Sequence, residues 1–255
     1  MPFHITDEHS HLESVIVASA HSEKMREQQE KFFTLLRNYG VQLLPANLLS
    51  TDVHQPYTRD IGFVCQDTFF YNLNRTLPER VPEFSAIQQH LQGQGKIIEI
   101  KEGKIEGGDV LVTPELLYIG ISERTDVTAV DEVEKYFPVH KLYFRSGVMH
   151  LDTRMTLLPR EYALIHSPAF LDYDIHQLQK KFELIEITEE EALGLAANVF
   201  VINPQTIVVH TGHQRIQKEL QDRGFAVEVA DYSELIGLQG SFRCTMLPLK
   251  RRISP

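Results

Sequence analysis

The chain has only two cysteines, no tryptophan and no long apolar run. The two cysteines, Cys65 and Cys244, lie far apart in a chain of 255 residues. In a reducing compartment such a pair is expected to stay as two thiols, so the sequence does not predict a disulfide framework. No stretch approaches the apolar length that a bilayer requires, so we expect no membrane span and no membrane partner.

Basic residues are also scarce. The chain has 25 Lys and Arg against 35 Asp and Glu, a formal net charge of -10. Phosphate binding needs clustered cations, and the one basic cluster, 250–252, is short, so we expect no nucleic-acid partner. Residues 1–20 lack a basic segment followed by a long apolar one, and we therefore expect no secretory signal and a cytoplasmic protein.

Apolar segments typical of strands recur along the chain. They are rich in β-branched or aromatic residues and are bounded by turn formers. Helical spacing of apolar residues separates them, most clearly in 22–40, which Gly40 should end, and in 213–224, which Gly224 should end. The expected strand segments are 14–19, 41–46, 63–72, 96–100, 110–122, 141–145, 155–166, 182–187, 199–210 and 226–230.

Three of these segments carry a proline between two apolar runs, at Pro114, Pro159 and Pro204. Each is typical of a β-hairpin, and a helix and another strand follow two of them. This order predicts a repeated unit of two strands, a helix and a strand, about 50 residues long, with roughly five units in the chain. Because no linker or low-complexity segment interrupts the pattern, we expect residues 1–255 to form a single α/β domain.

Polar residues stand at the boundaries of several of these segments, where catalytic groups are usually displayed. His150 and Asp152 alternate, so both should face the same side of an extended segment. Taken singly, each of these residues is more often structural, and Cys65, inside an apolar strand, is interpreted as core. The boundary residues are Asp60, Glu106, Asp109, His150, Asp152 and Cys244.

Taken together and in order, the segments "YTRD", "EGGDVL", "GISERTD", "HLDT" and "GSFRCTMLPL" resemble the signature segments of the guanidino-group modifying enzymes. That superfamily includes arginine deiminases, amidinotransferases and dimethylarginine dimethylaminohydrolases. The resemblance runs from about residue 10 to 250. It implies a five-bladed α/β propeller, or pentein, of pseudo-fivefold ββαβ units, with one central site to which each blade contributes.

The chemistry of a guanidinium group sets what such a site must contain. Its charge is delocalised and it stays protonated at neutral pH, so carboxylates must hold its plane, a strong nucleophile must attack its carbon, and an acid must protonate the departing nitrogen. No cofactor or metal is expected. The resemblance implies Cys244 as nucleophile, His150 as general acid and base, Glu106 as its orienting carboxylate, Asp60 and Asp152 as guanidinium clamps and Arg124 as the ligand of the substrate α-carboxylate.

Several points stay open at this stage. Arg75 and Arg80 are both candidates for a second arginine that binds the substrate α-carboxylate. Gly107 and Gly108 either let the backbone approach the site or only form a turn. Carboxylates near Cys244 should raise its pKa, so we expect the thiolate to become abundant mainly when the cationic substrate binds. A metal site at His210 and His213 is disfavoured because no third ligand is near in sequence.

The motifs favour a hydrolase acting on the guanidinium C–N bond of arginine or a close derivative through a covalent thiouronium. The position of Asp152, two residues after His150, resembles the pattern of deiminases and amidinotransferases. The chain length is nearer to that of dimethylarginine dimethylaminohydrolases. That enzyme, an amidinotransferase, an enzyme that hydrolyses arginine twice to ornithine, and a non-catalytic binding protein remain alternatives. The expected partner is a small cationic guanidino substrate, and a homo-oligomer is left open.

Overall fold

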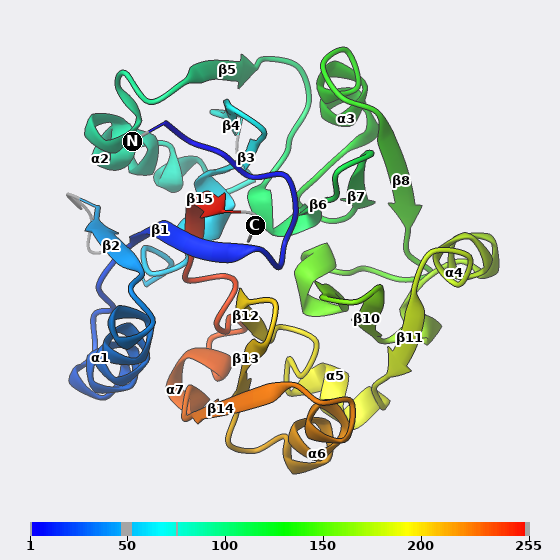
Figure 1. The fold of residues 1–255 in the computed structure, drawn as a ribbon. Helices are drawn as coiled ribbons and strands as arrows, with labels where there is room; N and C mark the ends of the chain where they lie inside the picture. Colours follow the sequence, from blue (N-terminus) through cyan, green and yellow to red (C-terminus); the bar gives the residue numbers. More distant parts are fainter. Residues whose placement is uncertain (1, 47–52, 75, 253–255) are drawn as a thin grey trace.

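Five small sheets are arranged around a common centre in this computed structural model, which describes residues 2–46, 53–74 and 76–252 (Figure 1). The strands are β1 (His11–Val17), β2 (Gln42–Pro45), β3 (Gly62–Cys65), β4 (Thr68–Asn72), β5 (Lys96–Ile100), β6 (Val110–Val112), β7 (Leu117–Ile121), β8 (Val139–Tyr143), β9 (Met155–Leu158), β10 (Tyr162–Ile165), β11 (Glu183–Glu186), β12 (Phe200–Asn203), β13 (Thr206–His210), β14 (Ala226–Ala230) and β15 (Leu247–Arg252). The α-helices are α1 (Glu23–Asn38), α2 (Glu83–Leu91), α3 (Val127–Val133), α4 (Asp172–Leu178), α5 (Glu189–Leu193), α6 (Gln214–Asp222) and α7 (Ser233–Ile236).

The same connection is repeated in four of the five sheets. In the sheet β3-β4-β5, β3 and β4 form an antiparallel hairpin, and β5 pairs parallel to β4 after the chain has passed through α2. A parallel neighbour needs such a crossover, and a helix usually supplies it. The sheets β6-β7-β8, β9-β10-β11 and β12-β13-β14 follow the same order, with α3, α4 and α6 in the crossovers. The predicted ββαβ repeat is therefore observed, and five such sheets fit a pseudo-fivefold arrangement.

The remaining sheet joins the two ends of the chain. Strand β15 pairs antiparallel with β1, and β2 pairs parallel with β1 after α1. The strand β15 was not among the strands expected from the sequence, because its partner β1 lies more than 200 residues away and its last three residues are basic. Arg251 of that basic cluster is buried, so the tertiary structure uses it inside the protein.

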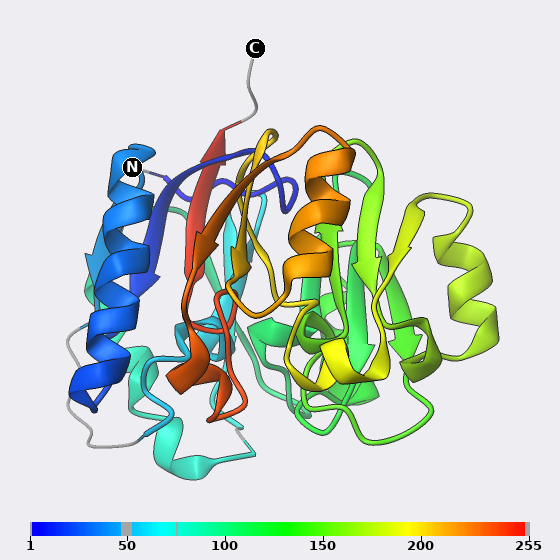
Figure 2. The ribbon, with the colours of Figure 1, turned by 90° about the horizontal axis from the view of Figure 1, so that it is seen from below.

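The helices of the crossovers, α1, α2, α3, α4 and α6, lie outside the ring of sheets (Figures 1 and 2). Helix α1 follows the expected pattern. Ser22 caps its first turn by accepting the Met25 N–H, Phe32 and Leu36 are buried, and Gly40 adopts a φ of 79° just after the last turn. A positive φ of this kind strains residues with a Cβ, so glycine is the natural stop. The predicted segments 63–72, 110–122, 155–166 and 199–210 each resolve into a hairpin of two strands.

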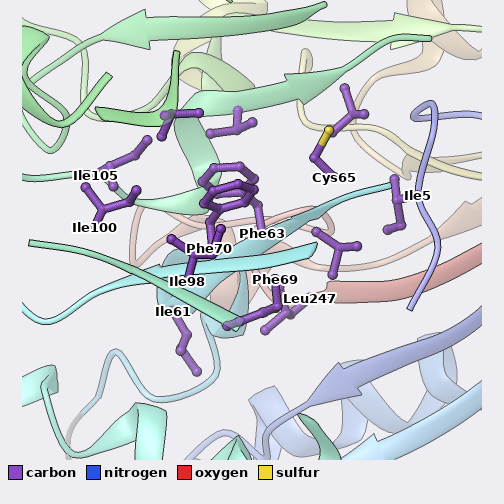
Figure 3. Close-up of a cluster of buried hydrophobic side chains, with 14 of the residues drawn as sticks. Ile5, Ile61, Phe63, Cys65, Phe69, Phe70, Ile98, Ile100, Ile105 and Leu247 are labelled. Atoms are coloured by element: carbon purple, nitrogen blue, oxygen red, sulfur yellow. The ribbon is translucent and has the colours of Figure 1, made fainter. Parts of the chain in front are cut away.

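Apolar side chains fill the space between the sheets and their helices. Cys65 packs in one such cluster with Phe63, Phe69 and Phe70 (Figure 3), so the interpretation of this cysteine as a core residue agrees with its position. Across the described ranges, none of the helices combines the length and the apolar character that crossing a membrane requires.

Candidate active site

The polar residues singled out from the sequence stand at one equivalent place in successive units, just before the first strand. Short 3-10 turns precede β3, β6 and β9, at Thr58–Ile61, Gly107–Asp109 and Leu151–Thr153. The first turn carries Asp60, and the other two turns follow directly on Glu106 and His150. Because the units are arranged around a centre, residues that occupy the same place in each unit converge there.

His150 lies between two carboxylates. Its Nε2 is 2.9 Å from Oε2 of Glu106 and its Nδ1 is 3.8 Å from Oδ1 of Asp60, and all three residues are buried. Burial by itself lowers the pKa of His150, but the charge of Asp60 and the hydrogen bond to Glu106 outweigh it and raise the pKa to about 10. His150 is therefore an imidazolium at neutral pH, with both ring N–H groups directed toward acids.

The two glycines before β6 let the backbone approach the site closely. A Cβ on Gly108 would lie 2.8 Å from Cγ and 2.9 Å from Nδ1 of His150, and one on Gly107 would lie 2.2 Å from the carbonyl oxygen of Gly62. Neither glycine has a positive φ, so conformational freedom does not explain them. Close approach does, and this resolves the alternative that the sequence left open.

Asp109 holds two of the turns together. Its Oδ2 accepts hydrogen bonds from the hydroxyls of Ser122 and Thr125, and its Oδ1 accepts the backbone N–H of Leu151. Burial raises the pKa of Asp109 to about 7, against the opposing charge of His150. This aspartate fixes the turn that carries His150 relative to the one that follows Glu106.

Cys244 is buried between Asp152 and an asparagine. Its Sγ is 4.0 Å from Oδ1 of Asp152, and the side-chain amide of Asn198 donates to it at 3.4 Å. The same amide donates to the backbone carbonyl of Asp152, while Oδ1 of Asn198 accepts the backbone N–H of Arg243. Burial first, and then the charges of Asp152 and Asp60, raise the pKa of the Cys244 thiol well above its usual value. The thiol is therefore protonated while the site is empty.

Asn198 was missed by the sequence analysis. It lies a few residues before β12, as Asp60, His150 and Cys244 lie a few residues before their own strands. The signal was present, because Asn198 is a polar residue between the apolar run "LAA" and the strand "VFVIN". An asparagine is not a typical catalytic group, so its chemistry drew no notice.

A small cavity brings together side chains from several of these turns. Asp60, Arg124, His150 and Cys244 all line it, whereas Glu106 and Asp152 do not. Among the buried atoms of the described residues, Oδ1 of Asp60 and Nη1 of Arg124 have no hydrogen-bond partner. The cavity thus offers an acceptor and a donor that are already desolvated. It is lined by His54, Tyr57, Asp60, Arg80, Arg124, Met149, His150, Leu238, Gln239, Gly240 and Cys244.

The sequence offered Arg75 and Arg80 as a second ligand of the substrate α-carboxylate. Arg75 lies outside the described residues. Arg80 reaches the cavity, but its guanidinium is engaged by Oδ2 of Asp60 at 2.7 Å, by Oε1 of Glu83 at 2.9 Å and by the backbone carbonyl of Tyr57 at 3.0 Å. In this conformation Arg80 fixes the orientation of Asp60.

The loop before Cys244 closes over the cavity and is held by one ring. The Tyr57 hydroxyl donates to the backbone carbonyls of Leu235 and Leu238, and a Cβ on Gly240 would lie 2.2 Å from a carbon of that ring. Gln239 adopts a φ of 64°, in the region that favours glycine. Leu238 and Gln239 of this loop form part of the cavity wall.

One group of buried side chains at the site has a spacing that could hold a metal ion. Asp60, Glu106 and His150 offer atoms within 4.8 Å of one another. However, an imidazole must be neutral to bind a metal, and the surrounding carboxylates hold His150 protonated. His210 and His213, the pair disfavoured as a metal site in the sequence, each have a backbone partner. Nδ1 of His210 accepts the backbone N–H of Tyr232, and Nε2 of His213 forms a hydrogen bond with the backbone carbonyl of Gly194.

The chain is similar to known proteins both in sequence and in structure. A profile of the family described as "N,N dimethylarginine dimethylhydrolase, eukaryotic" matches residues 6–251. The uncharacterized protein YkgA of Bacillus subtilis is 32% identical over 235 residues, which are 91% of this chain and 82% of that protein.

Two further relatives carry a function in their names. N(G),N(G)-dimethylarginine dimethylaminohydrolase of Pseudomonas aeruginosa is 26% identical over 172 residues, covering 63% of this chain and 62% of that enzyme. The N-terminal domain of ArgZ, an arginine dihydrolase from cyanobacteria, superimposes with a TM-score of 0.84 at 17% identity, covering 95% of this chain and 99% of that domain. At that identity the superposition shows a shared fold.

Proposed function

This chain belongs to the dimethylarginine dimethylhydrolase family of the guanidino-modifying superfamily, and from that premise we propose that it is a cysteine-dependent hydrolase of guanidinium C–N bonds. Its substrate is arginine or a close derivative. The five sheets then form the blades of one α/β propeller, and residues 1–255 act as a single catalytic domain. The observation that carries the proposal is the convergence of Cys244, His150 and Asp60 on one cavity.

The cavity suits a planar cation. Asp60 presents a buried oxygen without a hydrogen-bond partner among the described residues, and Asp152 places a second carboxylate beside the thiol. Guanidinium N–H groups pair well with carboxylate oxygens, and such charge-assisted bonds are stronger than neutral ones. Binding of a cation satisfies acceptors that the empty site leaves unpaired.

The same binding step activates the nucleophile. The carboxylates that hold the substrate raise the pKa of Cys244, and a substrate cation beside the sulfur offsets their charge. The thiol then loses its proton to solvent only when a substrate is present. An empty enzyme with a protonated thiol is protected from adventitious alkylation and oxidation.

The reaction proceeds in two halves. The Cys244 thiolate forms a C–S bond to the guanidinium carbon, and as the C–N bond breaks the imidazolium of His150 gives its proton to the departing amine. His150, now neutral, takes a proton from water, whose oxygen attacks the thiouronium carbon. The C–S bond breaks, the sulfur leaves as thiolate and a ureido product is released. Glu106 positions the imidazole through the 2.9 Å hydrogen bond.

Arg124 supports an amino-acid substrate. Its side chain lines the cavity, and its Nη1 is buried and 3.9 Å from Oε1 of Glu106. A guanidinium with an uncommitted donor is a good ligand for a substrate α-carboxylate. Arg80 completes this role only if it releases Asp60, so we assign it to the orientation of that aspartate.

Two neighbouring activities are distinguished by products. An amidinotransferase would use the same residues and replace water with an amine, and a dimethylarginine hydrolase would release dimethylamine. A non-catalytic binding protein would have no need for a thiol, an imidazolium and a carboxylate in one cavity. The match to the dimethylarginine family favours the methylated substrate, whereas the acid two places after His150 favours arginine.

Product analysis with L-arginine and with asymmetric dimethyl-L-arginine tests the proposal. Citrulline with ammonia, citrulline with dimethylamine, and ornithine with two ammonia each identify a different hydrolase. Cys244→Ser should abolish turnover at an unchanged melting temperature, whereas Cys65→Ser, a matched change at the other cysteine, should retain turnover in the folded fraction. Full activity of Cys244→Ser, or no turnover of either compound by the unaltered enzyme, would refute the proposal.

A further inference from the structure

Behind Cys244 lies a second cluster of charges that the reaction does not touch. Arg59, Arg243 and Arg251 are all buried, and they converge on the single carboxylate of Glu8. Glu8 belongs to the segment before β1, which loops across the centre of the ring of sheets (Figure 1). Its Oε2 is 3.0 Å from Nη2 of Arg243, and its Oε1 accepts the backbone N–H of Val112. Three cations thus share one anion directly beneath the site.

Arg243 differs from the other two arginines in what it leaves unpaired. Arg59 donates to the carbonyls of Gly107 and Val110, and Arg251 donates to backbone carbonyls at the far side of the cluster. Nε of Arg243 has no hydrogen-bond partner among the described residues. That atom is 3.8 Å from Oδ2 of Asp152, which is also buried without a partner.

Asp152 is therefore held between a fixed cation and the nucleophile. Its Oδ2 faces Arg243, and its Oδ1 is 4.0 Å from Sγ of Cys244. Asn198 ties the two sides together, because its Oδ1 accepts the backbone N–H of Arg243 and its amide nitrogen donates to both the backbone carbonyl of Asp152 and the Cys244 sulfur.

We propose that Arg243 is a positioning residue that keeps Asp152 ionised, and oriented toward Cys244, before the substrate arrives. The proposal rests on the function proposed above and names a group that this function needs but that no substrate atom touches. A carboxylate sealed from water and close to Asp60 would otherwise take up a proton and lose its attraction for a guanidinium. Glu8 holds the guanidinium of Arg243 at 3.0 Å, and this leaves Nε of Arg243 3.8 Å from Oδ2 of Asp152. At that separation the arginine stabilises the charge of Asp152 without forming a direct hydrogen bond to it.

The charges around Asp152 support this assignment. Burial raises its pKa, the charges of Arg243, His150 and Arg59 lower it, and Asp60 raises it again. Arg243 is the largest of the lowering influences. Since the pKa of Asp152 lies above its ordinary value, substrate affinity is lost as pH falls through that pKa, and the loss begins at a higher pH when Arg243 is absent.

The test measures binding apart from turnover. In a Cys244→Ser background, calorimetry should give the affinity for L-arginine and for asymmetric dimethyl-L-arginine from pH 5 to 9. Adding Arg243→Gln should weaken binding about tenfold or more at pH 7 and move the acid limb upward by about one pH unit. Arg251→Lys is the matched control, because it alters an equally buried arginine that faces no site carboxylate, and its profile should follow that of the parent.

A second variant guards against misfolding. Arg243→Gln leaves Glu8 with Arg59 and Arg251 as cationic neighbours, and Arg243→Met, which also removes the cation but keeps a flexible unbranched side chain, is the second variant. It should show the same upward shift of the acid limb. A profile identical to that of the parent in either folded variant would overturn the role of Arg243. If the unaltered enzyme neither binds nor converts any guanidino compound, the proposed function itself fails.

Discussion

The imidazolium of His150 should make the stability of the empty enzyme fall steeply in mild alkali. The pKa of His150 is raised from 6.5 to about 10 by Asp60 and Glu106. The folded protein holds this proton more tightly than the unfolded chain does, so the free energy of unfolding decreases as pH rises. The stabilisation is therefore fully present below pH 6.5, is lost progressively as pH rises, and has vanished above about pH 10.

The magnitude follows from the same numbers. At 1.36 kcal/mol for each pKa unit, the difference between 6.5 and about 10 corresponds to roughly 5 kcal/mol of unfolding free energy. This is an upper value, because the imidazolium of His150 is coupled to nearby carboxylates and part of the free energy belongs to the group as a whole. The thiol of Cys244 adds a decline only at higher pH.

Urea unfolding followed by circular dichroism at pH 6, 7, 8, 9 and 10 measures this dependence. The free energy of unfolding of the unaltered protein should fall by up to about 1.4 kcal/mol per pH unit across this range. His150→Gln should lack that decline, and because both proteins contain Cys244 its contribution cancels in their difference. His176→Gln, on the exposed face of α4, is the control and should follow the unaltered protein. Parallel lines for the unaltered protein and His150→Gln would refute the reasoning.

Two further changes test the geometry of the site. Gly108→Ala places a methyl group 2.8 Å from Cγ of His150, so the imidazole must tilt. We expect kcat to fall about tenfold or more and the protein to lose about 1–3 kcal/mol of stability. An unchanged kcat would contradict the close packing of Gly108 on His150. Asn198→Ala removes the amide that links Cys244, Asp152 and Arg243, so we expect about 1–3 kcal/mol less stability by urea unfolding and a lower kcat, and turnover equal to that of the unaltered enzyme would argue against the link.

Each unit of the fold supplies one polar position to the centre. Asp60 precedes β3, Glu106 comes just before the turn that leads into β6, and His150 does the same for β9. Asn198 and Cys244 stand in the same relation to β12 and β15. A repeated architecture thus places two carboxylates, an imidazole, an amide and a thiol a few residues before strands of successive units, so the chemistry of the site varies while the scaffold repeats.

The sequence by itself determined much of this protein. Alternation of apolar runs, turn prolines and helical spacing reflects interactions between near neighbours, so hairpins such as the one around Pro114 and helix α1 followed from local rules. The order of Asp60, Glu106, His150 and Cys244 pointed to one site, although only resemblance assigned their roles. Strand β15 was beyond local rules, because its partner β1 lies at the other end of the chain.

Only the tertiary structure decided which charges meet. That Glu106 bonds to His150, that Gly108 packs on its ring and that Arg80 engages Asp60 depends on distances between units, which no local pattern encodes. The same holds for Arg243, an arginine beside a cysteine in sequence, whose unpaired Nε faces Asp152 only because two units of the ring converge. Electrostatic influence depends on separation and burial in three dimensions, and the folded chain sets both.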